Sequence, residues 1–426
     1  MLGNMNNLLP NRRSLLIGAG ALGVAGFLAP TAWAFAAEVD TSDLADITAA
    51  VPRIGQPERL ARIERARRLM RASAIDAILI EPGASMIYFV GVEWHRSERL
   101  TALILTQTGD PVIVTPFFEE PSVRQTLGVP ADVRVWQEDE DPLALVAGAL
   151  RERGLANATV GIEETVRFFA SDGLAKRAPG LKIVSANPVV RGCRMRKTAA
   201  EIALMQAATD ITIAAYRWTY PRIREGMIPA EIGALMNAAT AKLGGAPEFE
   251  LILLGEAAAY PHGSNKPQHL REGEVVLMDC GCTVDGYQSD VSRTFVPGKA
   301  PDDVRRIWDI VARGQQLALA TAKLGTPAGA VDNAVRSYYE KQGFGPRYKL
   351  PGLSHRTGHG IGLEGHEPVN LVHGETTKLD TGMCFSNEPG IYWPGKFGVR
   401  LEDCFHMTGA GPKWFSEPPV SIDRPF

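Results

Sequence analysis

The sequence predicts an α/β domain followed by an α+β domain. The chain has 426 residues, 45% of them hydrophobic, and single hydrophobic cores stop growing at roughly 250–300 residues. Between residues 50 and 190, short apolar runs typical of strands alternate with helical patterns, which favours an α/β arrangement. Over residues 191–426, strand pairs are divided by glycine-rich turns, which favours an α+β domain.

The elements of the first domain have clear local signatures. Residues 58–73 are amphipathic and predict a helix, and helical patterns recur at 121–128 and 141–154. In the last of these, Asp141 suits the N-cap, Pro142 the first helical position and Gly154 the end of the helix. Strands are expected at 77–80, 100–106, 111–115, 133–136, 159–163 and 182–186.

The second domain begins after a joint expected at 187–201. Long helical patterns are expected to cover 201–220, 229–244, 301–325 and 331–343. The intervening segments combine apolar alternation with glycine-rich turns, which predicts hairpins.

The first 36 residues have the pattern of a signal peptide. They contain no acidic residue, and Arg12 and Arg13 precede a glycine- and alanine-rich apolar run. Small residues at 32–34 and 34–36 suit cleavage, and the paired arginines resemble a twin-arginine signal. We therefore expect export, most simply to a periplasm, with no membrane insertion after cleavage. The alternative is an uncleaved anchor, although about 16 apolar residues are short for a span of roughly 20.

Charge and cysteine content narrow the function classes. The formal net charge is −3 with no basic block, which argues against nucleic-acid binding. Five cysteines in a chain of this length do not make a disulfide scaffold. In an exported protein, disulfides could form among Cys280, Cys282, Cys384 and Cys404. The favoured interpretation is that they are small buried apolar side chains, above all Cys280, Cys282 and Cys404.

Two aspartates lie in one predicted hairpin that otherwise resembles core. Asp285-Gly286 favours a two-residue turn, in which facing residue numbers sum to 571. The residue numbers of Asp279 and Asp290 sum to 569, one diagonal step away from a facing pair. We therefore expect the two aspartates on one face of the hairpin, with their Cα atoms roughly 7–8 Å apart. A three-residue loop would place them on opposite faces, and two unrelated strand-end aspartates are the alternative. Like charges held close require a cation or a shared proton.

Histidines and carboxylates concentrate further along the chain. His355, His359 and His366 lie among glycines that leave room for close approach. Glu388 precedes Pro-Gly, and Glu402 follows another glycine-rich turn. Arg400 and Glu402 are expected on one strand face, and that segment alone predicts only an ordinary surface ion pair.

Four carboxylates and one imidazole could together bind a pair of divalent ions. Two-metal hydrolases hold such ions roughly 3.5–4 Å apart. Oxygen-rich donors with one nitrogen favour Mn, Co, Fe or Zn over Cu, and the carboxylate content favours Mn.

The order of these residues resembles the pita-bread metallopeptidases, which include methionine aminopeptidase, aminopeptidase P and prolidase. Within about residues 190–410 the chain carries these residues in the same order: Asp, a second Asp eleven residues later, His in GHGIG, Glu in NEPG and Glu in RLED. The domain expected at 50–190 is similar to the creatinase/prolidase N-terminal domain, which favours the aminopeptidase P/prolidase branch. The resemblance implies five metal ligands: Asp279, Asp290, His359, Glu388 and Glu402.

The resemblance also implies an activity: hydrolysis of the bond before proline in Xaa-Pro dipeptides or longer peptides, by a metal-bridging hydroxide. It implies Glu388 as base, His262 and His366 as substrate-binding and transition-state groups, His355 as an outer histidine and Arg400 as an arginine near Glu402. A homodimer is expected, in which Trp94, His95 or Arg96 could help to set substrate length at a neighbouring site.

Two other functions are compatible with this fold. A creatinase-like enzyme works without metals and is disfavoured because all five ligand positions are filled. An ectoine hydrolase-like enzyme acting on a small amide or cyclic amidine stays open. A non-catalytic peptide-binding module would typically have lost ligand residues, which this chain has not.

Overall fold

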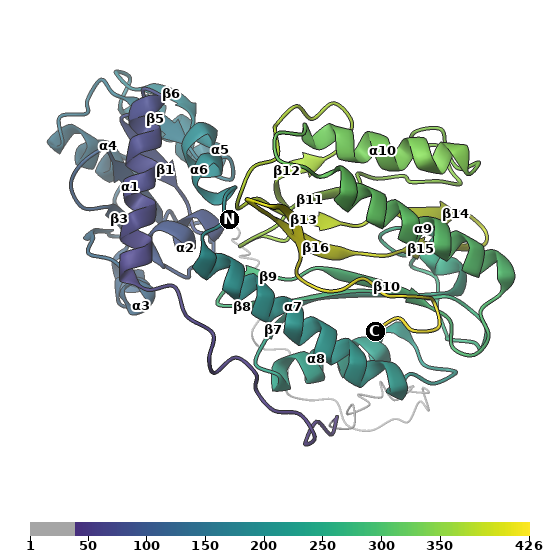
Figure 1. Cartoon of the computed structure of the whole chain (residues 1–426). Helices are drawn as coiled ribbons and strands as arrows, with labels where there is room; N and C mark the ends of the chain where they lie inside the picture. Colours follow the sequence, from purple (N-terminus) through teal and green to yellow (C-terminus); the bar gives the residue numbers. More distant parts are fainter. Residues whose placement is uncertain (1–38) are drawn as a thin grey trace, which may run out of the picture. The chain divides into compact units, whose positions relative to one another are not determined.

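The computed structural model describes residues 39–426 (Figure 1). The predicted signal peptide and its paired arginines lie outside these residues. Within residues 39–426, no helix has both the length and the apolar character needed to cross a membrane.

The first domain is built on a six-stranded mixed sheet with the strand order β4-β3-β2-β1-β5-β6. The pairs β1–β2 and β2–β3 are antiparallel, whereas β3–β4, β1–β5 and β5–β6 are parallel. The apolar runs of β1, β2 and β3 are fully buried, whereas the edge strands β4 and β6 are largely half-buried or exposed. The strands are β1 (Ala77–Ile80), β2 (Ala102–Thr106), β3 (Val112–Pro116), β4 (Asp132–Trp136), β5 (Thr159–Ile162) and β6 (Lys182–Ser185).

Six helices accompany this sheet. Asp141 caps α4 by accepting from the backbone N–H groups of Leu143 and Ala144, as the sequence predicts. The expected joint is partly helical, because α6 covers its first eight residues. The helices are α1 (Gln56–Ala72), α2 (Ala84–Val90), α3 (Glu120–Thr126), α4 (Pro142–Glu152), α5 (Phe168–Arg177) and α6 (Asn187–Arg194).

The second domain contains three sheets. One has the order β10-β8-β7 with β9 paired to β8, a second the order β12-β11-β13-β16-β17, and a third pairs β14 with β15. The first group comprises β7 (Ala246–Leu254), β8 (Val276–Val284), β9 (Tyr287–Gln288) and β10 (Val291–Phe295). The others are β11 (Gly358–Gly360), β12 (Glu367–Leu371), β13 (Cys384–Asn387), β14 (Gly390–Trp393), β15 (Phe397–Arg400), β16 (Asp403–Thr408) and β17 (Gly411–Trp414).

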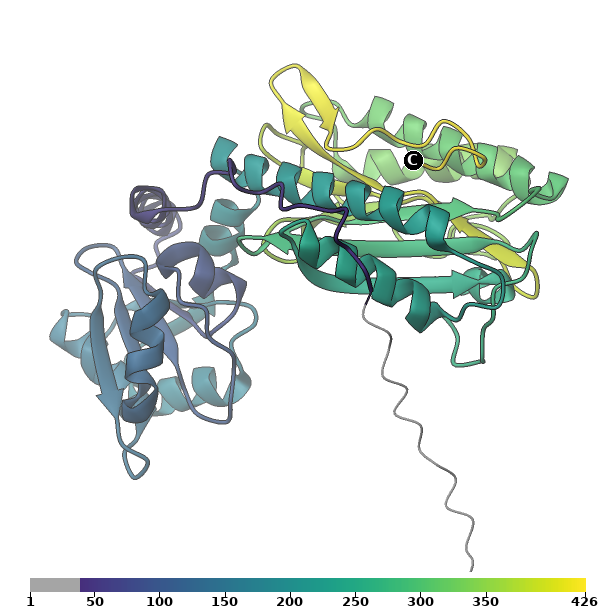
Figure 2. The ribbon, with the colours of Figure 1, turned by 90° about the horizontal axis from the view of Figure 1, so that it is seen from below.

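Two helix pairs flank these strands. Helices α7 (Ala199–Thr219) and α8 (Pro229–Lys242) pack on β8 and β7, respectively. Helices α9 (Asp302–Thr321) and α10 (Ala328–Lys341) pack on β15 and β12, respectively. In both views the members of each pair lie side by side (Figures 1 and 2).

The aspartate hairpin has the predicted register. Asp285 and Gly286 adopt φ values of 51° and 79°, as a two-residue turn of type I′ requires. Val284 faces Tyr287 and Asp279 faces Ser292, so Asp279 and Asp290 are diagonal neighbours on one face.

All five cysteines of the chain are buried and free. The structure therefore confirms the interpretation of Cys280, Cys282 and Cys404 as small buried side chains. Cys282 contacts the Thr212 hydroxyl at 3.4 Å, and the Cys404 thiol donates to the Asp290 carbonyl at 3.3 Å.

A buried ion cluster fixes the segment that follows β11. The Glu367 carboxylate accepts from Arg194 at 2.6 Å, from Lys197 at 2.8 Å and from the backbone N–H of Leu363 at 3.0 Å. Burial alone would raise the pKa of Glu367, but Lys197 and then Arg194 outweigh it and lower that pKa to about 2. The cluster ties the end of α6 and the residue Lys197 after it to the start of β12 and the loop before it.

We predict that Glu367→Gln destabilises the protein by about 3–5 kcal/mol at neutral pH, because two buried cations lose their partner. The pKa of Glu367 is depressed in the folded state, so its contribution is complete above its ordinary value of 4.5 and declines as the pH falls towards 2. Denaturant unfolding at a series of pH values should therefore show a gap between wild type and variant that narrows below about pH 4.5.

Glu364→Gln is the matched control, because Glu364 binds the same Arg194 but its side chain is 46% exposed. This control substitution should lower the free energy of unfolding by less than about 1 kcal/mol. A Glu367→Gln protein as stable as this control would contradict the prediction.

Candidate metal centre

Five side chains from two sheets converge on one centre. Asp279 lies within β8 and Asp290 immediately before β10, whereas His359 is the middle residue of β11. Glu388 follows β13, and Glu402 precedes β16. Potential ligand atoms of Asp290, His359 and Glu402 all lie within 4.8 Å of one another.

The imidazole of His359 lies close to two of these carboxylates, those of Asp290 and Glu388. Its Nε2 lies 3.7 Å from Asp290 Oδ2 and 3.3 Å from Glu388 Oε1. Its Nδ1 lies 3.0 Å from the Gly360 carbonyl, to which Nδ1–H donates. This bond leaves the Nε2 lone pair directed at the carboxylates, as in histidines that bind metals.

The glycines beside His359 are explained by close strand packing. A Cβ at Gly358 would lie 2.1 Å from the Ser386 carbonyl oxygen, and one at Gly360 would lie 2.6 Å from that of Pro368. No larger residue fits at either position, because the nearest atoms belong to the backbone of neighbouring segments. The group that approaches these glycines closely is therefore the backbone of neighbouring segments. This packing brings His359 near Glu388.

Arg400 connects the two sides of the centre. Its Nη2 donates to Asp279 Oδ2 at 2.6 Å and its Nε to Ser292 Oγ at 2.9 Å. Ser292 in turn donates to Glu402 Oε2 at 2.7 Å. The expected surface pair of Arg400 and Glu402 is wrong, because both residues are buried and Arg400 binds Asp279 instead. They also share no strand face, because Glu402 lies in the link between β15 and β16.

The electrostatics of the cluster indicate a missing positive charge. Burial, then Asp279, raises the pKa of Asp290, and burial, then Asp290, raises that of Glu402. Burial outweighs the opposing charge of Arg400 and raises the pKa of Glu388 to about 7. Asp279 Oδ1 is buried without a hydrogen-bond partner. This donor set, rich in oxygen with one imidazole nitrogen, fits divalent ions such as Mn²⁺.

The other predicted histidines surround the centre at different depths. The His366 ring lies 4.2 Å from that of His359, nearly perpendicular to it. The His355 Nε2 lies 2.8 Å from the Tyr392 hydroxyl, and its Nδ1 lies 3.8 Å from Glu388. Burial, then Arg400, lowers the pKa of His355 to about 3. His262 is exposed, next to Pro261, whose carbonyl accepts from Arg400 at 3.0 Å.

Sequence reasoning missed two members of this arrangement, Ser292 and Tyr392. Ser292 faces Asp279 in the predicted hairpin register, so the register itself could have identified it. Tyr392 bonds to His355 at 2.8 Å and to Arg400 at 3.3 Å. It lies in an apolar strand that gave no signal.

The aromatic segment of the first domain, residues 94–96, makes its side-chain hydrogen bonds within that domain. Trp94 Nε1 donates to Glu119 at 3.1 Å, and Arg96 donates to the Pro82 carbonyl at 2.9 Å. Trp94 and His95 also line a cavity of about 590 Å³ with the turn of the aspartate hairpin. None of the five predicted ligands lines that cavity.

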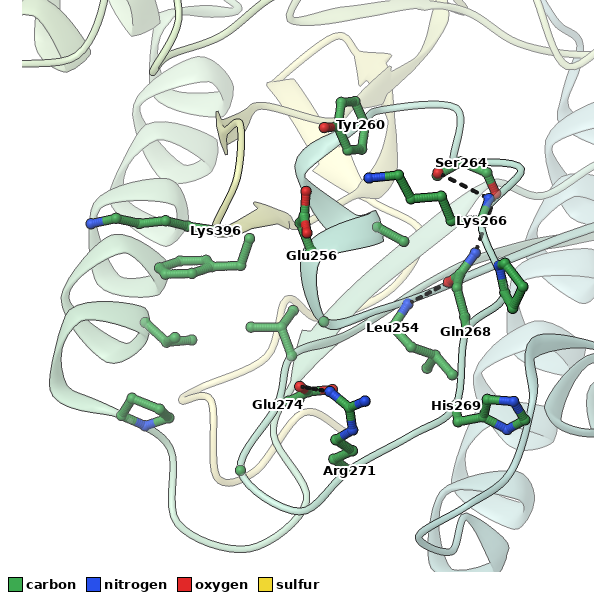
Figure 3. Close-up of a pocket in the computed structure, with 18 of the residues that line it drawn as sticks. Leu254, Glu256, Tyr260, Ser264, Lys266, Gln268, His269, Arg271, Glu274 and Lys396 are labelled. Atoms are coloured by element: carbon green, nitrogen blue, oxygen red, sulfur yellow. Dashed lines mark hydrogen bonds and ion pairs between the residues drawn. The ribbon is translucent and has the colours of Figure 1, made fainter.

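Another cavity lies beside the loop that carries His262. It measures about 520 Å³, and its lining includes Glu256, Tyr260, Lys266 and Lys396 (Figure 3). Figure 3 also shows Arg271 paired with Glu274, at 3.4 Å. The lining of this 520 Å³ cavity includes neither His262 nor any predicted ligand, so the cavity is not the metal centre.

Comparison with known proteins identifies both domains. The profile of metallopeptidase family M24 matches residues 203–409, and that of the creatinase/prolidase N-terminal domain matches residues 62–196. The chain is 33% identical to the probable dipeptidase PepE of Mycobacterium tuberculosis over 361 residues, 81% of this chain and 92% of that one. It is 32% identical to the Xaa-Pro dipeptidase of Lactobacillus helveticus over 361 residues, 83% and 96% of the two chains.

Solved structures show the same architecture. Dipeptidase PepE from Mycobacterium ulcerans superposes with a TM-score of 0.79 at 31% identity, covering 87% of this chain and 98% of that one. Recombinant prolidase from Thermococcus sibiricus superposes with a TM-score of 0.77 at 27% identity, covering 84% of this chain and 97% of that one. The predicted fold, a creatinase/prolidase-like N-terminal domain followed by a pita-bread catalytic domain, is confirmed. The chain belongs to metallopeptidase family M24.

Proposed function

We propose that this metallopeptidase uses two divalent ions to cleave the bond between an N-terminal residue and proline. The observation that carries the proposal is the cluster of largely buried carboxylates at His359, where Asp290, Glu388 and Glu402 lie close to the imidazole and Asp279 adjoins Asp290. The Xaa-Pro dipeptidase of L. helveticus, at 32% identity, supports proline at the second position. Ions held by Asp279, Asp290, His359, Glu388 and Glu402 would supply Lewis acidity, polarising the substrate carbonyl and lowering the pKa of water.

The chain's own residues would orient the substrate and transfer protons. Glu388 lies between His359 and His355, at 3.3 and 3.8 Å, where its carboxylate can accept a proton from the attacking water. Burial, then Arg356, lowers the pKa of His366, which favours the neutral ring, whose N–H can donate to the carbonyl oxygen. His262 lies on an exposed loop beside Arg400's partner Pro261, where it can contact the peptide.

We propose that the working form is a homodimer. Four phenylalanines of the first domain are between 42% and 79% exposed: Phe117, Phe118, Phe168 and Phe169. Arg99 stacks on Phe118 and Arg167 on Phe169, and Arg167 donates to the Arg99 carbonyl, so the rings form one patch. An exposed apolar patch favours a partner. A monomer mass for the mature chain by light scattering would contradict this proposal.

We also propose export by the twin-arginine route, which carries folded proteins and would allow metal loading before transport. The support is the sequence pattern around Arg12 and Arg13. Replacing both arginines by lysine should leave the uncleaved precursor in the cytoplasmic fraction. Processing of that variant at the wild-type rate would contradict the twin-arginine route.

The peptidase proposal is tested with residues 37–426, stripped of metal and reloaded with Mn²⁺. Ala-Pro and Ala-Pro-Ala are assayed for release of alanine. We expect cleavage that requires added metal and that falls by more than about 100-fold in Asp279→Asn, because that change removes one proposed ligand charge.

Asp285→Asn is the matched control. Asp285 lies at the turn of the same hairpin with a positive φ that asparagine tolerates, so its activity should stay within about threefold of wild type. If neither peptide is cleaved while metal is bound, the peptidase proposal is wrong. A small amide or cyclic amidine would then be the substrate class to test.

A further inference from the structure

The cavity drawn in Figure 3 has the size and composition of a ligand site separate from the metal centre. Its volume of about 520 Å³ lies within the range of about 300–1,000 Å³ that is typical of small-molecule pockets. One part of its lining is apolar and consists of residues that are at most 8% exposed: Ala257, Val275, Val304 and Phe397. Charged side chains line other parts of the cavity (Figure 3). This combination suits a small molecule that carries both charges and an apolar group.

Most of the charged groups in this lining already have partners within the protein. Arg271 donates to Glu274 at 3.4 Å. The Lys396 Nζ lies 3.7 Å from the centre of the Trp393 ring. The Asp303 carboxylate accepts from a backbone N–H in the first turn of α9 at 2.9 Å. These groups are therefore engaged before any ligand enters the cavity.

Lys266 and Glu256 are the exceptions. Among residues 39–426 neither side chain forms an ion pair or a hydrogen bond, although both line the cavity. Their charged atoms are therefore too far apart to bind each other directly. Figure 3 shows both side chains, together with the Tyr260 hydroxyl, directed toward the same part of the cavity. One cation and one anion are thus left available side by side.

The walls that carry these two groups are held in place. The 3₁₀ helix η3 (Gly255–Ala259) carries the free carboxylate and packs tightly on β15, because a Cβ at Gly398 would lie 1.9 Å from the Ala258 carbonyl oxygen. The loop that carries the free ammonium is joined to β7, because the Gln268 side-chain oxygen accepts from the Leu254 N–H at 2.9 Å. Walls that are already ordered lose little freedom when a ligand binds.

The two free charges favour a ligand that carries both signs. A simple anion would satisfy Lys266 but place a second negative charge near Glu256, and a simple cation would do the reverse, which costs free energy. A zwitterionic α-amino acid carries its carboxylate and its ammonium on one carbon atom. It can therefore bind both side chains at once through charge-assisted hydrogen bonds, and the Tyr260 hydroxyl can donate to its carboxylate.

We propose that this cavity is a binding site for a small zwitterionic α-amino acid with an apolar side chain. Lys266 binds its carboxylate, Glu256 binds its ammonium, and its side chain packs on the apolar part of the lining. The site is separate from the metal centre, and the inference does not depend on the proposed peptidase activity. Free proline belongs to this class of ligand and serves as the probe, because its ring is small and apolar.

Calorimetric titration of L-proline into Mn²⁺-loaded residues 37–426 tests the site directly. The matched ligands are N-acetyl-L-proline, which lacks the ammonium, and L-prolinamide, which lacks the carboxylate. We expect proline to bind, and each matched ligand to bind more weakly by about tenfold or more, because each loses a charge-assisted hydrogen bond. Lys266→Met and Glu256→Gln should each weaken proline binding by about the same factor.

Lys299→Met is the matched control, because Lys299 is exposed and does not line the cavity. It should leave proline binding unchanged, and so should Asp279→Asn, which alters only the metal centre. The inference is overturned if millimolar proline gives no binding, or if Lys266→Met and Glu256→Gln bind it as wild type does. Loss of binding in Asp279→Asn would likewise overturn it by placing proline at the metal centre. Cleavage of Ala-Pro is assayed separately, so none of these outcomes decides the proposed function.

Discussion

The repulsion among four largely buried carboxylates is the constraint around which the second domain is organised. Asp279, Asp290, Glu388 and Glu402 carry four negative charges when ionised, and Arg400 pairs directly with one of them, Asp279. The net charge of −3 in a poorly solvated site is costly. One divalent ion would bring it to −1 and two would bring it to +1. Protonation is the alternative, which explains why the pKa values of Asp290 and Glu402 are raised.

The surrounding structure holds these charges in place. Buried Arg293, in β10, binds Asp403 at 2.8 Å and the Glu402 carbonyl at 2.9 Å, which joins the two larger sheets of the domain beside two ligands. Glycines on both sides of His359 allow β11 to approach Ser386 and Pro368. Supporting contacts of this kind fix the orientation of metal-ligand side chains.

Local patterns predicted much of this arrangement. The Asp285-Gly286 turn fixed the register of the hairpin, and with it the diagonal placement of Asp279 and Asp290. Contacts between distant segments could not be read in this way. Glu367 meets Arg194 across 173 residues, and Tyr392 meets His355 across 37. Arg400 was misread for the same reason, because its partner Asp279 lies 121 residues away whereas Glu402 is a sequence neighbour.

The central claim is that the carboxylate cluster binds two metal ions, and counting the ions tests it most directly. Residues 37–426 would be equilibrated with Mn²⁺ and the bound metal measured by mass spectrometry, together with Asp290→Asn. The account predicts about two ions per chain in wild type and at most about one in the variant, because Asp290 shares one close group of potential ligand atoms with His359 and Glu402. No bound ion in wild type, or the same number in both proteins, would contradict it.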